Sequence, residues 1–352
     1  MSILTTIKLD VTTNKCKLDE LIIFHYLFYM VPRRKFIKQS SIALASIVAG
    51  SNLLAACSKR AQEEKIGIQL YTMRDELAAN AKQTIMKIAN IGYGHVETFY
   101  DYGTEKNSGK YWGLTTAELK NLLAENNLKT YSGHYQLNNF LTMGKGQDDE
   151  LKQQAEIAVN LGQRYLIVPV PPMTLIDKLT LADFEFMAEQ LNKGGEYCKS
   201  VGLKIGYHNH FWEFRGYGED KKTGYDVLLS NTDPELVAFE LDMFWAIKSG
   251  AHPLELFSKY PKRFEMWHVK DIDKSKPEVI VGQGKDSLPS MDILKDIKFA
   301  EVGTGSVDYK AIFKKADEAG LKHFFVEQDG IYMSNHYESI RSSFNYIKGN
   351  LI

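Results

Sequence analysis

The stretch "LADFEFMAEQLNKGGEYCKSVGLKIGYHNH", residues 181–210, contains the unit that decides the fold. Residues 181–202 carry apolar side chains at helical spacing, and Gly202 stands where a helix would end. The run "KIGYHNH" follows and reads as a buried strand. The stretch therefore predicts a helix followed directly by a strand, and this strand ends on two histidines, His208 and His210.

The same alternation of strands and helices runs from Lys65 to the C-terminus. Eight strands are predicted, at residues 65–72, 95–100, 129–135, 164–170, 204–210, 237–244, 264–271 and 323–329. Helical patterns lie between them, at residues 75–92, 115–128, 149–162, 181–202 and 308–320, and Gly92, Gly162 and Gly320 are expected helix ends. Eight such repeats predict an α/β protein with a closed (β/α)₈ TIM barrel.

A doubly wound open sheet is the alternative architecture. It is disfavoured because "YTMRDEL", which follows the first strand, has no glycine-rich phosphate loop. Residues 272–306 are predicted to form a long irregular loop ahead of the last helix.

The bulk composition excludes two classes of protein. The 352 residues carry a formal net charge of -1, which gives no electrostatic reason to expect nucleic acid as a partner. The three cysteines, Cys16, Cys57 and Cys198, are too few and too far apart for a zinc ribbon or a disulfide framework. Cys198, on a predicted helix, is expected to be a packed thiol.

The first sixty residues have the pattern of a targeting signal. "VPRRKFIKQSSIALASIVAGSNLLAACSKR", residues 31–60, has twin arginines, then an apolar run, then "LAAC". This order resembles a twin-arginine export signal, and "LAAC" resembles a lipobox whose cysteine, Cys57, is lipidated. We therefore expect an exported, periplasmic or membrane-anchored lipoprotein. Residues 30–57 are the predicted signal, 58–64 a short linker and 65–352 the barrel, whereas residues 1–29 precede the usual signal start and are interpreted as a spurious extension.

Polar side chains collect at the ends of seven of the eight predicted strands. They are Gln69, Glu97, His134, His208, His210, Glu240, Asp242, His268, Lys270, Glu327 and Asp329. The chemistry of a TIM barrel lies at this end of its strands. Each residue alone is explained by capping a helix or bonding a loop amide, but burying so many ionisable groups together is costly without a metal or ligand. Histidines with carboxylates suit Zn²⁺, Mn²⁺ or Co²⁺.

The ordered set "HNH", "ELD", "HVKD", "GTGSVDYKAIFKKADEAG" and "FVEQD" resembles the xylose-isomerase-like TIM-barrel superfamily of sugar isomerases, epimerases and inosose dehydratases, which also includes endonuclease IV. The resemblance covers the chain from about Lys65 onward. It implies one divalent metal ion held by Asp242, His268 and Glu327, with His208 in the place of the family's first glutamate. In some members a histidine three residues after the aspartate helps to bind a second metal. Trp245 occupies that position here, which disfavours endonuclease chemistry.

The resemblance also implies roles for the other groups. Glu327 is the expected general base and Lys270 or His134 the expected acid, while the metal polarises a carbonyl. Substrate contacts are expected from His210, Glu97, Trp245 and Gln69, and Glu97, Glu240 and Asp329 are alternatively groups that orient the histidines. Aromatic residues near the strand ends are expected to pack on sugar faces: Tyr71, Tyr135, Phe211, Trp212, Phe244 and Trp245.

These expectations describe a metal-dependent sugar isomerase or epimerase. It would act on a small sugar or keto-sugar by removing a proton next to a carbonyl. The departure at His208 leaves two alternatives open, because a metal-bound imidazole has its lone pair committed and cannot be a second base. One alternative is a keto-glycoside lyase or dehydratase of the same fold, and the other is a non-catalytic carbohydrate-binding lipoprotein.

Overall fold

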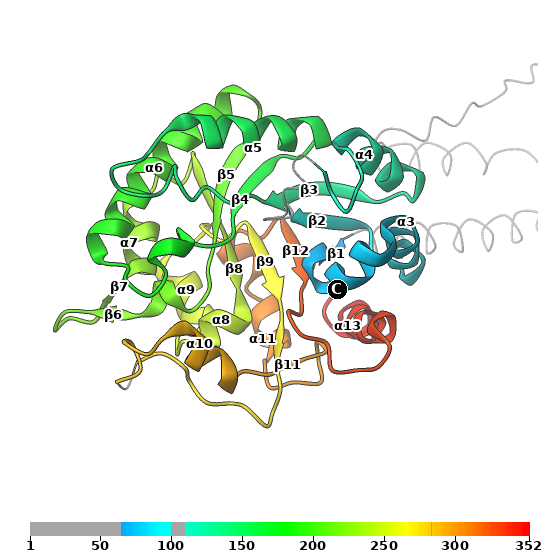
Figure 1. The fold of residues 1–352 in the computed structure, drawn as a ribbon. Coiled ribbons are helices and arrows are strands. Elements are labelled where there is room, and N and C mark those ends of the chain that lie inside the picture. The colour runs from blue at the N-terminus through cyan, green and yellow to red at the C-terminus, as the bar shows by residue number, and fades with distance from the viewer. Residues whose placement is uncertain (1–64, 100–109, 283) are drawn as a thin grey trace, which may run out of the picture. The chain divides into compact units, whose positions relative to one another are not determined.

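Eight parallel strands form a closed barrel in this computed structural model, which describes residues 65–99, 110–282 and 284–352 (Figure 1). The strands are β1 (Ile66–Gln69), β2 (His95–Phe99), β3 (Lys129–His134), β4 (Tyr165–Val168), β5 (Lys204–His208), β8 (Val237–Asp242), β9 (Met266–Val269) and β12 (His323–Val326). Each neighbours the next of this series, and β12 closes the ring by pairing with β1. The predicted barrel is thus confirmed, and all eight strands lie inside the predicted ranges.

Helices surround the barrel on its outer side (Figure 1). They are α3 (Arg74–Ile91), α4 (Thr116–Glu125), α5 (Asp148–Leu161), α6 (Leu181–Ser200), α7 (Gly224–Asn231), α8 (Met243–Lys248), α9 (Pro253–Lys259), α11 (Tyr309–Phe313), α12 (Ala316–Ala319) and α13 (His336–Asn350). Thr115 and Thr180 start α4 and α6 with capping boxes. Gly162 and Gly320 end α5 and α12 in the left-handed conformation, which costs glycine little.

The predicted helix at residues 308–320 is two short helices. Asp308 caps α11 by accepting a hydrogen bond from the Ala311 amide. At the junction the Lys315 amide donates to the Ile312 carbonyl, three residues back, so the helical turn tightens and α11 ends before α12 begins. The prediction of one continuous helix was wrong at this point.

The interior of the barrel is layered. An apolar layer consists of Tyr165, Ile167, Ala238, Met266 and Phe325, which form a hydrophobic cluster of their own. Strand side chains alternate in direction, so the residues two positions farther along β8, β9 and β12, namely Glu240, His268 and Glu327, point into the barrel as well. The apolar layer therefore forms the floor below a polar layer at the carboxyl ends of the strands.

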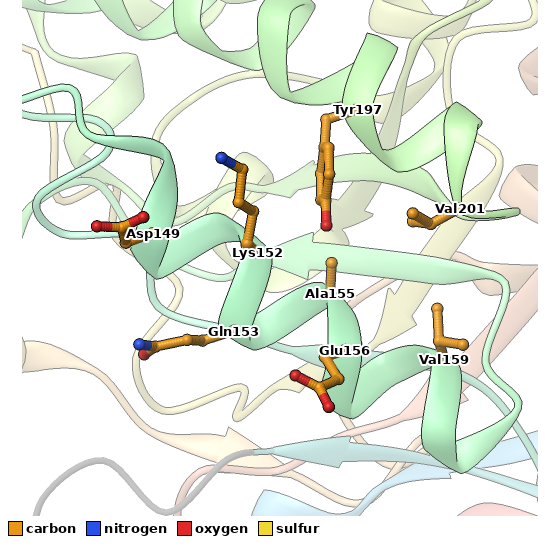
Figure 2. A pocket seen from close by; sticks show the side chains of 8 residues that line it. All are labelled: Asp149, Lys152, Gln153, Ala155, Glu156, Val159, Tyr197 and Val201. Carbon is orange, nitrogen blue, oxygen red and sulfur yellow. The ribbon is translucent and has the colours of Figure 1, made fainter.

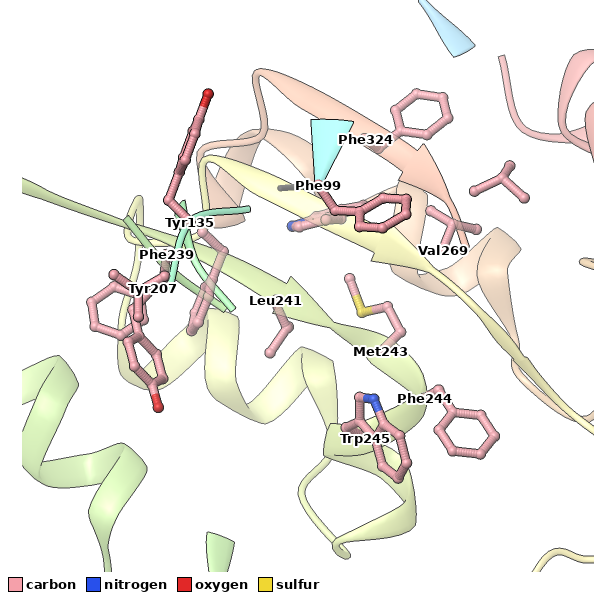
Figure 3. Close-up of a cluster of buried hydrophobic side chains, with 14 of the residues drawn as sticks. Phe99, Tyr135, Tyr207, Phe239, Leu241, Met243, Phe244, Trp245, Val269 and Phe324 are labelled. Carbon is pink, nitrogen blue, oxygen red and sulfur yellow. The ribbon is translucent and has the colours of Figure 1, made fainter. Parts of the chain in front are cut away.

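The residues that alternate with these polar groups belong to a second hydrophobic cluster. Phe239 and Leu241 flank Glu240 on β8, and Figure 3 shows them with Tyr207 and with Met243 and Trp245 of α8. The same cluster contains the buried faces of the surrounding helices, for example Leu191 of α6. Packing on the outside of each strand thereby fixes which side chains face the barrel interior.

The described residues of the segment 272–306, namely 272–282 and 284–306, are more ordered than the sequence indicates. β10 (Asp271–Ile272) pairs with β11 (Phe299–Ala300), and α10 (Ser290–Ile293) and η5 (Leu294–Asp296) lie between them. The Asp271 carboxylate accepts hydrogen bonds from the amides of Gly303, Gly305 and Val307, which ties the end of this segment to β10. The prediction of an irregular loop was therefore wrong in part, because the contacts that order it come from distant residues.

Smaller elements complete the described chain: η1 (Leu70–Met73), η3 (Met173–Leu175), η4 (Trp212–Phe214), β6 (Gly216–Tyr217) and β7 (Lys222–Thr223). Within the described residues no helix combines the length and the apolar character that crossing a membrane requires. The predicted spurious extension, the export signal, Cys57 and the linker, residues 1–64, lie outside the described residues.

Candidate functional site

A cavity of about 350 Å³ opens at the carboxyl ends of the barrel strands. Six polar side chains line it: His134, Gln136, His208, His210, Glu327 and Asp329. The remaining lining is aromatic and aliphatic: Tyr71, Phe99, Pro169, Val170, Met173, Trp212, Trp245, Leu294, Ile297 and Phe299. Polar groups that converge inside a largely apolar cavity are typical of a small-molecule site.

A second cavity, of about 510 Å³, lies on the outside of the barrel between α5 and α6 (Figure 2). Asp149, Lys152, Gln153 and Glu156 of α5 line it, together with Tyr197 of α6. The exposed charges of α5 line this groove, whereas the buried histidines and carboxylates of the barrel lie elsewhere. The greater volume therefore does not make it the better candidate, and the cavity at the barrel mouth contains the chemistry.

Four buried side chains at the barrel mouth form a candidate metal centre. His208, Asp242, His268 and Glu327 each offer one ligand atom, and these atoms lie within 4.8 Å of one another. The Nε2 atom of His208 is 3.8 Å from Asp242 Oδ2, and the Nδ1 atom of His268 is 2.7 Å from Glu327 Oε2. Three of the residues come from β5, β8 and β9, and Glu327 directly follows β12; they are the ligands that the family resemblance implies.

The donor chemistry of this group fits a divalent cation. Two imidazoles and two carboxylates are the ligands that Zn²⁺ and its neighbours in the first transition row accept. The Oδ2 atom of Asp242 is buried without a hydrogen-bond partner among the described residues, although the Lys270 ammonium lies 2.9 Å away. A buried carboxylate oxygen with capacity left to accept is what a metal ligand offers before the ion binds.

A second group of potential ligands overlaps the first. It comprises His134, His208, Glu240 and His268, again with ligand atoms within 4.8 Å. The Oε2 atom of Glu240 lies 2.9 Å from His134 Nε2, 3.1 Å from His208 Nδ1 and 3.1 Å from His268 Nε2. The two groups share two histidines but use opposite ring nitrogens of each.

Lys270 supplies positive charge next to the metal group. Its ammonium lies 2.7 Å from Glu327 Oε2, 2.9 Å from Asp242 Oδ2 and 2.9 Å from Asp329 Oδ2. Burial alone would lower the pKa of Lys270, but these three carboxylates outweigh it and hold the pKa well above its usual value. Lys270 is therefore charged at neutral pH, and its ammonium also lies over the ring of Trp245 at 5.5 Å.

Burial and neighbouring charges separate the protonation states of the other groups. Burial would raise the pKa of Glu327, but Lys270 and His268 hold it well below the usual range, so this carboxylate is ionised. Burial would lower the pKa of His134, yet Glu97 and Glu240 raise it to about 9. Burial lowers the pKa of His208 well below its usual value, and the neutral imidazole has a lone pair to donate. Burial raises the pKa of Asp242 to about 6.

The predicted substrate contacts divide into two sets. His210 and Trp245 line the cavity, and their ring centroids are 5.2 Å apart. Gln69 and Glu97 are fully buried and are not among the lining residues. Gln69 Nε2 donates to Glu97 Oε2, which also lies 2.7 Å from His268 Nε2. Their placement is that of groups that support a histidine, so their role in substrate binding stays a prediction.

The aromatic residues expected to contact a sugar also divide. Tyr71, Trp212 and Trp245 line the cavity. Tyr135, Phe211 and Phe244 are fully buried and belong to the hydrophobic cluster instead. Strand ends alone could not separate these sets, because orientation depends on which helix or loop covers each ring.

Part of the cavity wall has no counterpart in the predicted site. Leu294 and Ile297 come from the segment between β10 and β11, and Phe299 is the first residue of β11. Hydrogen bonds hold this segment to the barrel: Trp212 Nε1 donates to Ser290 Oγ at 2.6 Å, and the Ser290 amide donates to Asp177 Oδ1 at 3.0 Å. The sequence contains no local pattern that would have predicted a contact between residues so far apart along the chain.

Comparison with known proteins agrees with this architecture. The family described as xylose isomerase-like TIM barrel matches residues 85–343. An inosose dehydratase of Clostridium beijerinckii is 30% identical over 169 residues, which are 47% of this chain and 54% of that protein. The matched part of the chain thus spans about half the length of the curated relatives.

Two solved structures extend the comparison. A sugar phosphate isomerase/epimerase from Parabacteroides distasonis is 26% identical, with a TM-score of 0.64 over 80% of this chain and 93% of that one. The IOLI protein with a bound zinc atom is 16% identical, with a TM-score of 0.59 over 81% of this chain and 97% of that one, and at this identity it supports the fold alone.

Proposed function

The chain belongs to the xylose isomerase-like TIM barrel family, and on that premise we propose that it is a divalent-metal-dependent enzyme acting on a small sugar or keto-sugar. The reaction begins with removal of a proton from the carbon next to a carbonyl. The observation that carries this proposal is the group of His208, Asp242, His268 and Glu327 within 4.8 Å, beside a cavity of about 350 Å³.

His208, Asp242, His268 and Glu327 would hold the metal ion. Its chemistry is that of a Lewis acid, which polarises a carbonyl and stabilises the negative charge that develops when the neighbouring proton leaves. Transition metals with nitrogen and oxygen ligands suit the site, and a relative of the same fold contains zinc.

Glu327 is the proposed base. It is ionised, it lines the cavity, and Lys270 at 2.7 Å keeps it so. One of its oxygens accepts the substrate proton while the electron pair of the C–H bond moves toward the carbonyl. Because Glu327 would also help to hold the metal, it would lie close to a carbonyl that the metal polarises, which favours the adjacent carbon as the site of proton removal.

His134 and Lys270 are the proposed proton donors. His134 lines the cavity and carries a proton at neutral pH, since its pKa is raised to about 9. Lys270 is charged too, but its three carboxylate partners make its proton harder to remove. His134 is therefore the better proton donor to a leaving group, and Lys270 mainly stabilises charge near Glu327.

We favour elimination over epimerisation as the outcome. The C–H and C–O bonds of adjacent carbons break, a carbon–carbon double bond forms, and the leaving hydroxyl takes a proton from His134 and departs as water. Two-base epimerisation needs a second base facing Glu327, and that position is held by His208, whose lone pair would be committed to the metal. The curated relatives named inosose dehydratase support the same choice. One-base isomerisation, closer to the expectation from the sequence, ranks second.

The cavity lining favours an unphosphorylated substrate. Among the described residues that line it there is no lysine or arginine, and two of its polar members are carboxylates. Lys270 is engaged by three carboxylates, and Arg74, beside Tyr71, donates to the carbonyls of Tyr71 and Asp329. A phosphate dianion would find no free cation among these side chains and would face repulsion from Glu327 and Asp329.

The test is incubation of the protein, loaded with Zn²⁺, Mn²⁺ or Co²⁺, with free inososes, keto-sugars and 3-keto-glycosides in deuterated water. Loss of one water from an inosose or keto-sugar, or of the aglycone alcohol from a 3-keto-glycoside, supports elimination. Deuterium incorporation next to the carbonyl without loss of water supports isomerisation. Absence of both with every substrate and metal contradicts the proposal, and turnover of only phosphorylated sugars contradicts its substrate class.

Export belongs to the proposal as well. The twin arginines and "LAAC" support transfer across a membrane and lipidation of Cys57. Metabolic labelling with a radioactive fatty acid checks it: the wild-type chain should be labelled and the Cys57→Ala chain should not, and equal labelling of the two would contradict lipidation at this cysteine.

A further inference from the structure

The carboxylate of Glu240 stands behind the proposed metal centre rather than in it. It is fully buried on β8, two residues before Asp242, and its register partner on β5 is His208. We propose that Glu240 is a positioning residue that, with Glu97 beside it, fixes the ring protons of both metal-group histidines in opposite tautomers. His208 then faces the metal with Nε2 and His268 with Nδ1. This inference rests on the proposed metal-dependent function.

The distances define the two sides of each ring. For His208, Nδ1 lies 3.1 Å from Glu240 Oε2, whereas Nε2 faces Asp242 Oδ2 at 3.8 Å. For His268, Nε2 lies 3.1 Å from Glu240 Oε2 and 2.7 Å from Glu97 Oε2, whereas Nδ1 faces Glu327 and Asp242. An ionised carboxylate accepts hydrogen bonds and does not donate them, so the nitrogen that faces Glu240 or Glu97 carries a proton. The Nδ1 atom of His268 faces Glu327 at 2.7 Å and would give up its own proton when the metal ion takes that place.

The proton on one nitrogen leaves the lone pair on the other. With its proton on Nδ1, His208 has its lone pair on Nε2, on the side of Asp242. With its proton on Nε2, His268 has its lone pair on Nδ1, on the side of Glu327. Carboxylates behind metal-bound histidines generally set tautomer and ring orientation in this way. The unusual point here is that a single carboxylate oxygen contacts two ligand histidines. These histidines lie on β5 and β9, the strands on either side of β8.

His134 is the third histidine in contact with this oxygen, and its Nε2 atom lies 2.9 Å from Glu240 Oε2. His134 lines the cavity, so Glu240 links the support of the metal group to the proposed acid. The other oxygen of Glu240, Oε1, is buried and has no hydrogen-bond partner among the described residues. The carboxylate therefore exerts its effect through one oxygen, Oε2.

The same geometry argues against a second cation in the overlapping group of His134, His208, Glu240 and His268. If both groups bound metal at once, His208 and His268 would each bind two cations through both nitrogens and would each have to lose both ring protons. Neutral imidazole has one lone pair for one metal, and a second site would cost two further deprotonations in a buried setting. We therefore expect one metal ion for each chain.

The test compares Glu240→Leu with the wild-type chain, using Zn²⁺ as the probe. Zn²⁺ affinity is measured by competition with a chelator, and the histidine tautomers of the Zn²⁺-loaded protein are read from long-range ¹H–¹⁵N spectra. The wild-type chain should bind one Zn²⁺, with the proton of His208 on Nδ1 and that of His268 on Nε2. Glu240→Leu should lower the affinity by about 10- to 100-fold and lose this pattern.

Two further variants keep the test decisive. Glu240→Asp withdraws the carboxylate by one methylene, about 1.5 Å, and should show the same loss of Zn²⁺ affinity and of the tautomer pattern. It replaces Glu240→Leu if that variant does not fold. Glu265→Gln is the matched control, because Glu265 is a buried carboxylate bound by Tyr165, Lys204 and Lys322, away from the metal group. It should bind Zn²⁺ like the wild type.

The outcomes separate this inference from the proposed function. A wild-type chain that binds no divalent metal overturns the proposed function. If the wild-type chain binds one Zn²⁺, and Glu240→Leu or Glu240→Asp shows the same Zn²⁺ affinity and the same histidine tautomers, only the role of Glu240 is overturned. Two Zn²⁺ ions per wild-type chain, or the same tautomer on both rings, also overturn it.

Discussion

Asp242 and His268 are register partners on the neighbouring parallel strands β8 and β9, and Asp242 Oδ2 lies 3.9 Å from His268 Nδ1. The two backbones are fixed by the strand pairing, so the two side chains meet without help from a loop. Both are fully buried. A site built on strands is held more rigidly than one built on loops, so single substitutions there should report on the role of one side chain.

The first prediction separates the two histidines of "YHNH". His208→Ala removes a proposed ligand, and we expect the affinity for Zn²⁺ to fall by more than about 100-fold, since loss of an outer partner alone costs 10- to 100-fold. His210→Ala should keep the affinity for the metal and raise the KM, because His210 lines the cavity and its Nδ1 atom has no hydrogen-bond partner among the described residues. Metal analysis and steady-state kinetics check both. Equal metal loss in the two variants would contradict the assignment.

The second prediction concerns Glu327. Glu327→Gln keeps the shape of the side chain but cannot accept the substrate proton, so kcat and the exchange of the proton next to the carbonyl should fall by about 10²- to 10⁴-fold. Asp329→Asn is the control, because Asp329 contacts Lys270 at 2.9 Å and is not a proposed ligand or base. Its effect should stay below tenfold. The measurement is deuterium exchange with protein whose metal content has been matched, and a Glu327→Gln chain that exchanges at the wild-type rate would sink the assignment.

The third prediction uses two tryptophans in the same chemical state. The indole N–H groups of Trp245 and Trp267 are both buried without a hydrogen-bond partner among the described residues. Trp245 lines the cavity, whereas Trp267 stacks on Phe257 at 5.2 Å within the hydrophobic cluster. If the Trp245 N–H donates to a substrate hydroxyl, Trp245→Phe should raise the KM by about 2- to 10-fold, the worth of one hydrogen bond.

Trp267→Phe serves as the control for this comparison. It removes the same N–H from a position that the substrate does not reach, so the KM should not change. Steady-state kinetics on the two purified variants give the answer. A KM that rises equally in both would show that the effect comes from packing and not from the substrate contact.

The fourth prediction is a dependence of stability on pH at the opposite end of the barrel. His323 stacks on Tyr131 at 4.2 Å, and burial, with the charges of Arg164 and Lys322, lowers its pKa to about 4. The unfolded chain takes up this proton near pH 6.5 and the folded chain does not, so the free energy of unfolding falls as the pH drops from 6.5 toward 4. Between pH 7.5 and 5 the loss should be about 2 kcal/mol.

Chemical denaturation at the two pH values measures this loss against His323→Gln, which cannot titrate. The difference in unfolding free energy between the wild type and the variant should shift by about 2 kcal/mol against the wild type at the lower pH. Several other buried groups titrate in the same range, but they are common to both chains and cancel. A difference that does not change with pH would refute the neutral state of the half-buried His323.

Much of the fold could be predicted from local patterns. Alternating apolar runs located all eight strands, and closing glycines such as Gly162 and Gly320 located helix ends, because both signals arise from neighbours along the chain. The prediction of a single helix at residues 308–320 was wrong, because the tightened turn between α11 and α12 leaves no mark in the apolar pattern. The order in residues 272–306 was missed because Asp271 and Trp212 supply it from outside the segment.

The sequence by itself determined the barrel and the end of the barrel that carries the polar residues, because strand periodicity and residue type are local properties. The set of four potential ligands came from the family resemblance. Only the tertiary structure decided that Gln69 and Glu97 lie behind the histidines, that Glu240 contacts three imidazoles, and that the segment between β10 and β11 closes the cavity wall. Those relations depend on strand register and on which nitrogen of each ring faces which carboxylate, and both are set by contacts between residues far apart in the chain.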